Sequence, residues 1–292
     1  MNNITKVGFG KMLCKELGLI DANVDTVLKQ NFGSRTAIMI PVEIVGDKKI
    51  GMNVYIDDYY ENYLNGRTTI EEVLECIKDI IKEFENSGDY NKVSKELEIL
   101  YDFEKVKGQL FIKVMDTKRN LNLLDTLIHE NFLNLSIVPY IKMGTEMTIN
   151  VNQKIQKCWN IEEKEILSIA TKNTFKESNI DFVSFAEMLG IPSFGPEMYV
   201  LSNKDKFFGA SMITSREILL SVAKKLNSNF YIFPSSVHEC IILKESSDSD
   251  STEYLKMVED INESVVDGSD FLSDAVYYYD LLEEKIILKE IC

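Results

Sequence analysis

The stretch Pro234-Ser-Ser-Val-His-Glu239 holds the most chemically reactive side chains in the shortest space. It combines hydroxyls, an imidazole and a carboxylate, which are the groups of a Ser–His–carboxylate hydrolase. The candidate catalytic residues are therefore Ser235, Ser236, His238 and Glu239. A triad is usually assembled from distant segments, however, and no GxSxG elbow accompanies this one. We therefore favour a structural interpretation, in which the serines satisfy turn backbone groups and His238 bonds to a neighbouring loop.

The sequence predicts no metal site. Both histidines, His129 and His238, precede a glutamate, but leucine at 133 and isoleucine at 242 exclude the HExxH pattern. On a strand that starts at Val237, His238 and Cys240 would share one face and could form a Cys–His pair. The next residue on that face is Ile242, which favours Cys240 as a small core residue instead.

Nucleotide-binding loops are missing as well. Gly8-Phe-Gly10 starts a GxG, but Leu13 stands where the third glycine belongs and no strand is predicted before it. The sequence also lacks GxxxxGK[ST], the phosphate-binding P-loop. We therefore expect no cofactor.

Composition indicates an ordinary globular protein. The chain has 292 residues, of which 45% are hydrophobic and 27% charged, and this length suggests two domains at ~150 residues each. We expect the boundary near residue 153, with subdomains 1–153 and 154–292. Five singly spaced cysteines indicate free thiols in a reducing compartment, the cytoplasm. No apolar run approaches the ~18 residues that a membrane span needs, so we expect no membrane association.

The charge is strongly acidic and unevenly distributed. The net charge is −15, and Glu245–Cys292 alone carries 14 acidic residues against three lysines. Such a surface disfavours direct binding to nucleic acid and suits a basic protein partner, although a solvated face is the simplest interpretation. A further alternative is an acidic mimic of nucleic acid, which predicts carboxylates spaced like phosphates along one ridge.

Short strand-like runs alternate irregularly with helical segments. The runs 24–30, 35–40 and 49–56 predict an antiparallel meander. Thr68 and Glu71 have capping-box spacing ahead of a helix with one apolar stripe that ends near residue 86. Later segments predict a helix over 181–189 and strands over 206–210, 230–233 and 238–244. Because βαβ alternation is missing, we expect an α+β fold with short antiparallel sheets packed against amphipathic helices.

Two tyrosine-rich clusters have the composition of interaction surfaces, because tyrosine offers a large contact area with a polar tip. They equally suit the edges of an α+β core, which is the more ordinary interpretation. The interaction candidates are Asp57, Asp58, Tyr59, Tyr60, Tyr277, Tyr278, Tyr279 and Asp280.

Four segments in one order resemble a bacterial family catalogued only as a domain of unknown function. They are Asp57-Asp-Tyr-Tyr-Glu-Asn-Tyr-Leu-Asn-Gly66, Met198-Tyr-Val-Leu-Ser-Asn-Lys204, Phe230-Tyr-Ile-Phe-Pro-Ser-Ser-Val-His-Glu239 and Ser273-Asp-Ala-Val-Tyr-Tyr-Tyr-Asp280. The family is common in anaerobic Gram-positive bacteria and often carried on mobile elements, and the resemblance covers nearly the whole chain. Phe233 departs from the leucine expected there. The resemblance implies no catalytic role for any residue.

These observations favour a non-catalytic protein-interaction or regulatory module of the cytoplasm. The resemblance to proteins carried on mobile elements implies a phage or mobile-element factor that acts on a host protein. The main alternative is a hydrolase that uses His238 and Glu239 with Ser235 or Ser236. A pocket that gathers His238 with a second carboxylate would support the hydrolase.

Overall fold

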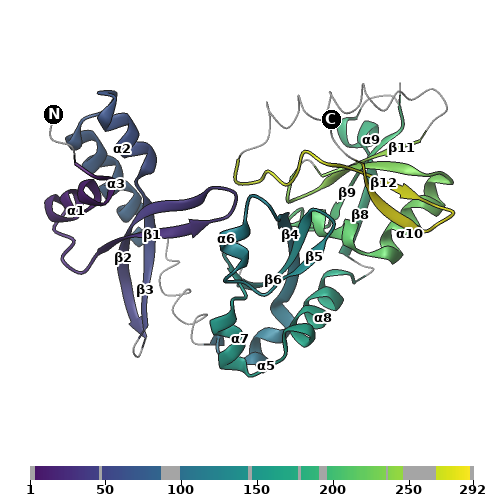
Figure 1. The fold of residues 1–292 in the computed structure, drawn as a ribbon, viewed down its shortest axis with the longest axis horizontal. Coiled ribbons are helices and arrows are strands. Elements are labelled where there is room, and N and C mark those ends of the chain that lie inside the picture. Colours follow the sequence, from purple (N-terminus) through teal and green to yellow (C-terminus); the bar gives the residue numbers. More distant parts are fainter. Residues whose placement is uncertain are drawn as a thin grey trace. The chain divides into compact units, whose positions relative to one another are not determined.

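The chain folds into two compact units, Met1–Asp102 and Phe103–Cys292, each with its own sheet or sheets and helices (Figure 1). The computed structural model describes residues 4–45, 48–86, 99–143, 147–176, 179–190, 196–234, 236–245 and 268–289. Antiparallel sheets of three, four and six strands are mixed with helices, which confirms the expected α+β class.

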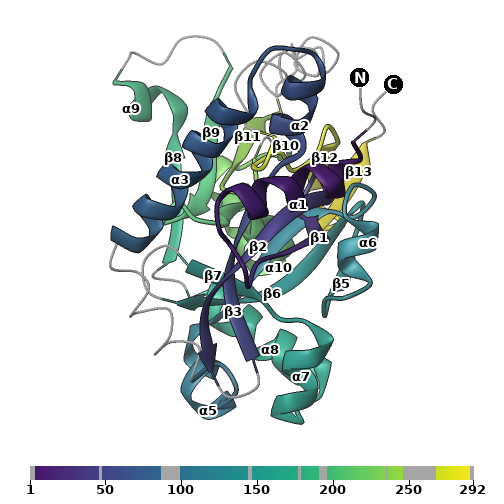
Figure 2. The same ribbon diagram turned by 90° about the vertical axis from the view of Figure 1, so that its left-hand side faces the viewer.

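The first unit is a three-stranded antiparallel sheet in the order β1-β2-β3, as the three apolar runs predict. Helices cover one face of this sheet (Figure 2). Phe9 and Leu13 from the first helix and Ile77 from the third meet Ile38 of the central strand in the core. The elements are α1 (Lys6–Glu16), β1 (Asn23–Lys29), β2 (Gly33–Val45), β3 (Lys48–Tyr55), α2 (Asp57–Leu64) and α3 (Ile70–Asn86).

The capping box of α3 lies one residue later than the predicted pair Thr68 and Glu71. The Thr69 hydroxyl accepts from the Glu72 N–H at 3.2 Å, and the Glu72 carboxylate accepts from the Thr69 N–H at 2.9 Å. Thr69 is the cap because its carbonyl accepts the first helical bond, from Val73. Two hydrogen bonds lower the pKa of the Glu72 carboxyl: the larger effect comes from the Thr69 N–H and the smaller from the Thr68 hydroxyl.

The second unit contains two antiparallel sheets. One has the order β13-β12-β10-β11-β9-β8, and in the other β6 pairs with β4, β5 and β7. The strands are β4 (Leu110–Asp116), β5 (Glu130–Phe132), β6 (Leu135–Met143), β7 (Met147–Asn150), β8 (Ile180–Ser184), β9 (Met198–Asn203), β10 (Phe230–Phe233), β11 (Cys240–Lys244), β12 (Val276–Asp280) and β13 (Lys285–Lys289). The helices are α5 (Phe103–Val106), η1 (Lys107–Gln109), α6 (Leu121–Leu124), α7 (Gln153–Trp159), α8 (Glu163–Thr174), α9 (Phe185–Leu189), η3 (Gly209–Thr214) and α10 (Arg216–Leu226).

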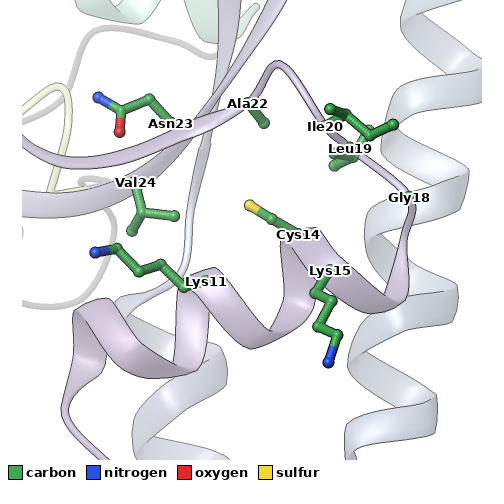
Figure 3. Close-up of a pocket in the computed structure, with 9 residues that line it drawn as sticks. All are labelled: Lys11, Cys14, Lys15, Gly18, Leu19, Ile20, Ala22, Asn23 and Val24. Atoms are coloured by element: carbon green, nitrogen blue, oxygen red, sulfur yellow. The ribbon is translucent and has the colours of Figure 1, made fainter.

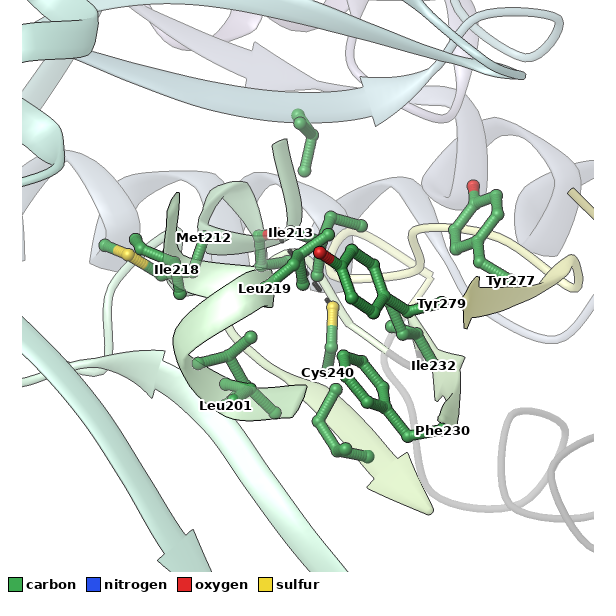
Figure 4. Close-up of a cluster of buried hydrophobic side chains, with 14 of the residues drawn as sticks. Leu201, Met212, Ile213, Ile218, Leu219, Phe230, Ile232, Cys240, Tyr277 and Tyr279 are labelled. Atoms are coloured by element: carbon green, nitrogen blue, oxygen red, sulfur yellow. Dashed lines mark hydrogen bonds between the residues drawn. The ribbon is translucent and has the colours of Figure 1, made fainter. Parts of the chain in front are cut away.

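One apolar core joins both sheets of the second unit. Val114 of β4 and Leu135 of β6 belong to the same buried cluster as Leu201 of β9 and Ile232 of β10, and α10 adds Leu219 (Figure 4). This shared core explains why the compact units divide at Asp102 rather than near the expected residue 153. A boundary at 153 would separate the four-stranded sheet from the strands against which it packs.

The short helix η3 crosses β9 at very close range. A Cβ built on Gly209 would overlap the Ser202 hydroxyl oxygen. It would also lie 2.6 Å from the Asn203 amide nitrogen and from the His238 carbonyl oxygen, both of which are backbone atoms. Only glycine permits this crossing, because backbone atoms cannot move aside as a flexible side chain can.

We predict that Gly209→Ala lowers the free energy of unfolding by about 2–3 kcal/mol, the cost of overpacking a rigid site. Gly108→Ala is the matched control, because nothing lies within 4 Å of a Cβ there. The control should change stability by less than about 0.5 kcal/mol. Urea unfolding followed by circular dichroism measures both, and equal midpoints would contradict the steric argument.

Candidate functional site

The turn that carries His238 is held by its own serine. The Ser236 hydroxyl oxygen accepts from the His238 N–H at 3.1 Å and from the Glu239 N–H at 3.3 Å. The Val237 N–H donates to the Asp270 carbonyl at 2.8 Å, and Ser236 forms a β-bridge with Phe271. Ser236 therefore acts as a turn residue that satisfies backbone donors.

The imidazole of His238 has a partner at each nitrogen. Its Nδ1 accepts a hydrogen bond of 3.2 Å from the Phe208 N–H. The proton of the neutral ring must then reside on Nε2, which lies 3.5 Å from Asp270 Oδ1. The ring also stacks on Phe208, with 5.6 Å between centroids and 5° between planes. His238 is thus fixed in orientation and in tautomer.

Among the described residues, the His238 ring is paired with the Phe208 amide and Asp270 rather than with the Ser236 and Glu239 of the triad considered from the sequence. A general base needs a free nitrogen lone pair, and Nδ1 already accepts from a backbone amide. The carboxylate that faces the imidazole is Asp270, not the sequence neighbour Glu239. Ser235 lies outside the described residues.

Lys113 of β4 is a buried cation in the same neighbourhood. Its side chain is only 4% exposed, and Nζ lies 4.7 Å from the centroid of the Phe208 ring. Burial lowers the pKa of Lys113 to about 8. Tyr140 of β6 meets the same ring edge-on at 5.0 Å. Sequence reasoning missed Lys113, although a lysine inside an otherwise apolar strand is a visible signal.

Cys240 is a core residue. It is fully buried, and its Sγ lies 3.9 Å from the Ala210 carbonyl oxygen. Burial raises the pKa of the thiol, so the nucleophilic thiolate is disfavoured. Within the described residues, no group of three His, Cys, Asp or Glu side chains could hold a metal ion.

The first cluster of interaction candidates is partly structural. Asp57 is 6% exposed, and its carboxylate accepts from Lys6 Nζ and from the Thr36 N–H, each at 2.9 Å. The Tyr60 hydroxyl donates to the Ile4 carbonyl at 2.7 Å, and Tyr59 packs against the core of the first unit. Of these four residues, only Asp58 is largely exposed, and its Oδ1 lies 3.7 Å from Arg35 Nη1.

The second cluster lies on β12 and is mostly buried. Tyr277 and Tyr279 belong to the core (Figure 4), and the Tyr277 hydroxyl donates to Asn134 Oδ1 at 2.5 Å. The half-buried Tyr278 donates to Glu245 at 2.9 Å, and burial together with that carboxylate raises its pKa to about 12. Asp280 caps the turn into β13. Tyr277 and Tyr279 are therefore unavailable to a partner in this conformation.

One protein family matches most of this chain. The model of a family of unknown function, DUF5688, matches residues 11–281. The chain belongs to this family. The DUF5688 match spans the surroundings of His238 and the first unit from Lys11 onward, which confirms the resemblance to a domain of unknown function. No curated protein and no solved structure matches the chain. In the described part of this DUF5688 chain, no helix is long and apolar enough to cross a membrane.

We predict that the stability of His238 variants of this DUF5688 chain depends on whether the new side chain can accept the hydrogen bond from the Phe208 N–H. His238→Asn places an amide oxygen near the position of Nδ1, whereas His238→Leu keeps similar volume without an acceptor. The asparagine variant should be more stable by about 1 kcal/mol, the typical net value of one hydrogen bond. Urea unfolding tests the order, and equal stability of the two variants would show that this hydrogen bond contributes nothing.

We also predict a pH dependence from Lys113. Its folded pKa, about 8, lies below its ordinary value of 10.5, so the unfolded chain binds more protons between these values. The free energy of unfolding should therefore rise between pH 8 and 10.5. Lys113→Met should remove up to about 3 kcal/mol of this rise. Lys118→Met, at an exposed position, is the control, and identical pH profiles for Lys113→Met and wild type would contradict the prediction.

Proposed function

We propose that this DUF5688 chain is a non-catalytic protein-interaction or regulatory module. The observation that carries the proposal is the engagement of both His238 nitrogens, one by a backbone amide and the other beside Asp270. The most reactive motif of the sequence thereby serves to hold a turn. The burial of Lys113 and Cys240 supports the same conclusion, since neither side chain is open to a substrate.

The finer proposal concerns setting and partner. Singly spaced cysteines favour the cytoplasm. The resemblance to proteins carried on mobile elements favours a host protein as the partner of a phage or mobile-element factor. The net charge of −15 makes direct binding to nucleic acid unfavourable.

The test is affinity purification of the tagged full chain from its own host, as wild type and as His238→Asn, with bound proteins identified by mass spectrometry. We expect one protein at stoichiometric amounts with both forms, and its binding should be reproduced with purified components. His238→Asn keeps the structural hydrogen bond but has no titratable ring. Failure to recover any partner from repeated, well-expressed preparations would overturn the proposal, and so would a hydrolytic activity lost in His238→Asn.

A further inference from the structure

The two histidines of the chain face opposite kinds of hydrogen-bond partner. His238 Nδ1 accepts from the Phe208 N–H at 3.2 Å, whereas His129 Nδ1 lies 3.2 Å from the Leu127 carbonyl oxygen, which can only accept. When an imidazole becomes charged, both of its nitrogens carry protons. The charged ring therefore keeps the hydrogen bond of His129 but loses that of His238.

The hydrogen bond that a charged His238 loses holds an uncommon backbone conformation. Phe208 has φ of +53°, and such a conformation persists in a bulky residue only where its neighbours hold it. The preceding residue is held separately, because the Phe207 N–H donates to Asn203 Oδ1 at 3.0 Å and the Phe207 carbonyl accepts from Asn203 Nδ2 at 2.7 Å. Protonation of His238 therefore acts on the Phe208 amide and not on the Phe207 amide.

A carboxylate at the other nitrogen favours the charged ring. Asp270 Oδ1 lies 3.5 Å from His238 Nε2, and both side chains are partly exposed, so protons reach the ring from water. Lys113 Nζ, 4.7 Å from the centroid of the Phe208 ring, opposes a second positive charge there. The other charged residues of the segments 203–209, 236–239 and 268–275 are Lys204, Asp205, Lys206, Glu239 and Asp274, of which Asp205 and Lys206 form ion pairs with Lys142 and Asp181. Asp270 is thus the counter-charge that an imidazolium gains.

Buried thiols do not titrate in the pH range in which an imidazole gains its charge. Burial raises the pKa of Cys14, which points from α1 into a groove beside the start of β1 (Figure 3), and burial also raises the pKa of Cys240. Both groups stay neutral thiols from about pH 8 down to about pH 5. A conformational change of the second unit in this range is therefore not due to Cys240, and Cys14 belongs to the first unit.

We propose that His238 is a proton-sensitive switch at the contact between the two sheets of the second unit. The neutral ring holds the Phe208 amide, and the charged ring releases this amide and forms an ion pair with Asp270. Because the Phe208 ring contacts Lys113 of β4, release of its amide loosens the packing of the turn on the four-stranded sheet. An imidazole gains its charge between about pH 8 and about pH 5, so the switch responds to mild acid. The switch is independent of the interaction function proposed above.

The test follows the amides of the full wild-type chain by NMR at about pH 8 and about pH 5. We expect hydrogen exchange at the Phe208 N–H, corrected for the intrinsic effect of pH, to speed up about fivefold relative to the Phe207 N–H, as the loss of one hydrogen bond implies. The ring nitrogen-15 signals should show an unprotonated Nδ1 on His238 at the higher pH. A protonated Nδ1 there, or equal protection of the Phe208 amide at both pH values, would overturn the inference. This measurement needs no variant to fold.

Two pairs of variants assign the response to its residues. His238→Asn keeps an acceptor without a titratable ring, so its Phe208 amide should not respond to pH, whereas His129→Asn should respond like wild type. A response that persists in His238→Asn would contradict the switch.

Asp270→Asn should lower the midpoint of the wild-type response by roughly 0.5–1 pH unit, because the charge that favours the imidazolium is gone. Asp274→Asn, at an exposed position of the same segment, is the matched control and should leave the midpoint unchanged. An unchanged midpoint in Asp270→Asn would exclude the exchange of partners at His238.

Discussion

The second unit depends on the close crossing at Phe208 and Gly209. Phe208 has φ of +53°, a left-handed conformation that is uncommon for a bulky residue, and its N–H is held by His238. Its ring contacts Lys113 of the four-stranded sheet, while His238 belongs to the turn that leads into the six-stranded sheet. Gly209 then lies so close to the Asn203 amide nitrogen and the His238 carbonyl oxygen that a Cβ would not fit. Because these elements meet backbone against backbone, none can shift without displacing the others.

The same region shows that side chains of a reactive motif can be engaged in local contacts. Serine, histidine and acidic side chains form local hydrogen bonds at turns with the same groups that perform catalysis. In the turn that carries His238, the Glu239 N–H is held by the Ser236 hydroxyl, whereas the imidazole faces Asp270. The carboxylate that faces the ring comes from Asp270, beyond a stretch of chain that the structure does not describe. The linear order of the motif therefore does not reveal which carboxylate faces the imidazole.

The parts of the fold that the sequence could predict are those with strong local periodicity. The helix Ile70–Asn86 has one continuous apolar stripe, and the strand Phe230–Phe233 was predicted with its observed bounds. The expected helix over 181–189 was half wrong, because Ile180–Ser184 pairs with β9 and only Phe185–Leu189 is helical. The strand expected over 206–210 was wrong, since Lys206 and Phe208 both have positive φ, which no apolar pattern reveals. Tertiary pairing and unusual backbone conformations decided these segments rather than local preference.

The two units differ in where their charged chemistry lies, and this difference bears on function. In the second unit, Lys113 is buried, and both nitrogens of His238 have polar neighbours within the fold. In the first unit, by contrast, Lys11 and Lys15 are exposed on α1, in a sequence that also carries the exposed Glu16 and Asp21. At physiological salt, charges farther than ~8 Å away are largely screened, so the net charge of −15 describes the whole chain and not the field at any one surface. A partner would therefore sense the charges close to its own contact surface before it sensed the charge of the whole chain.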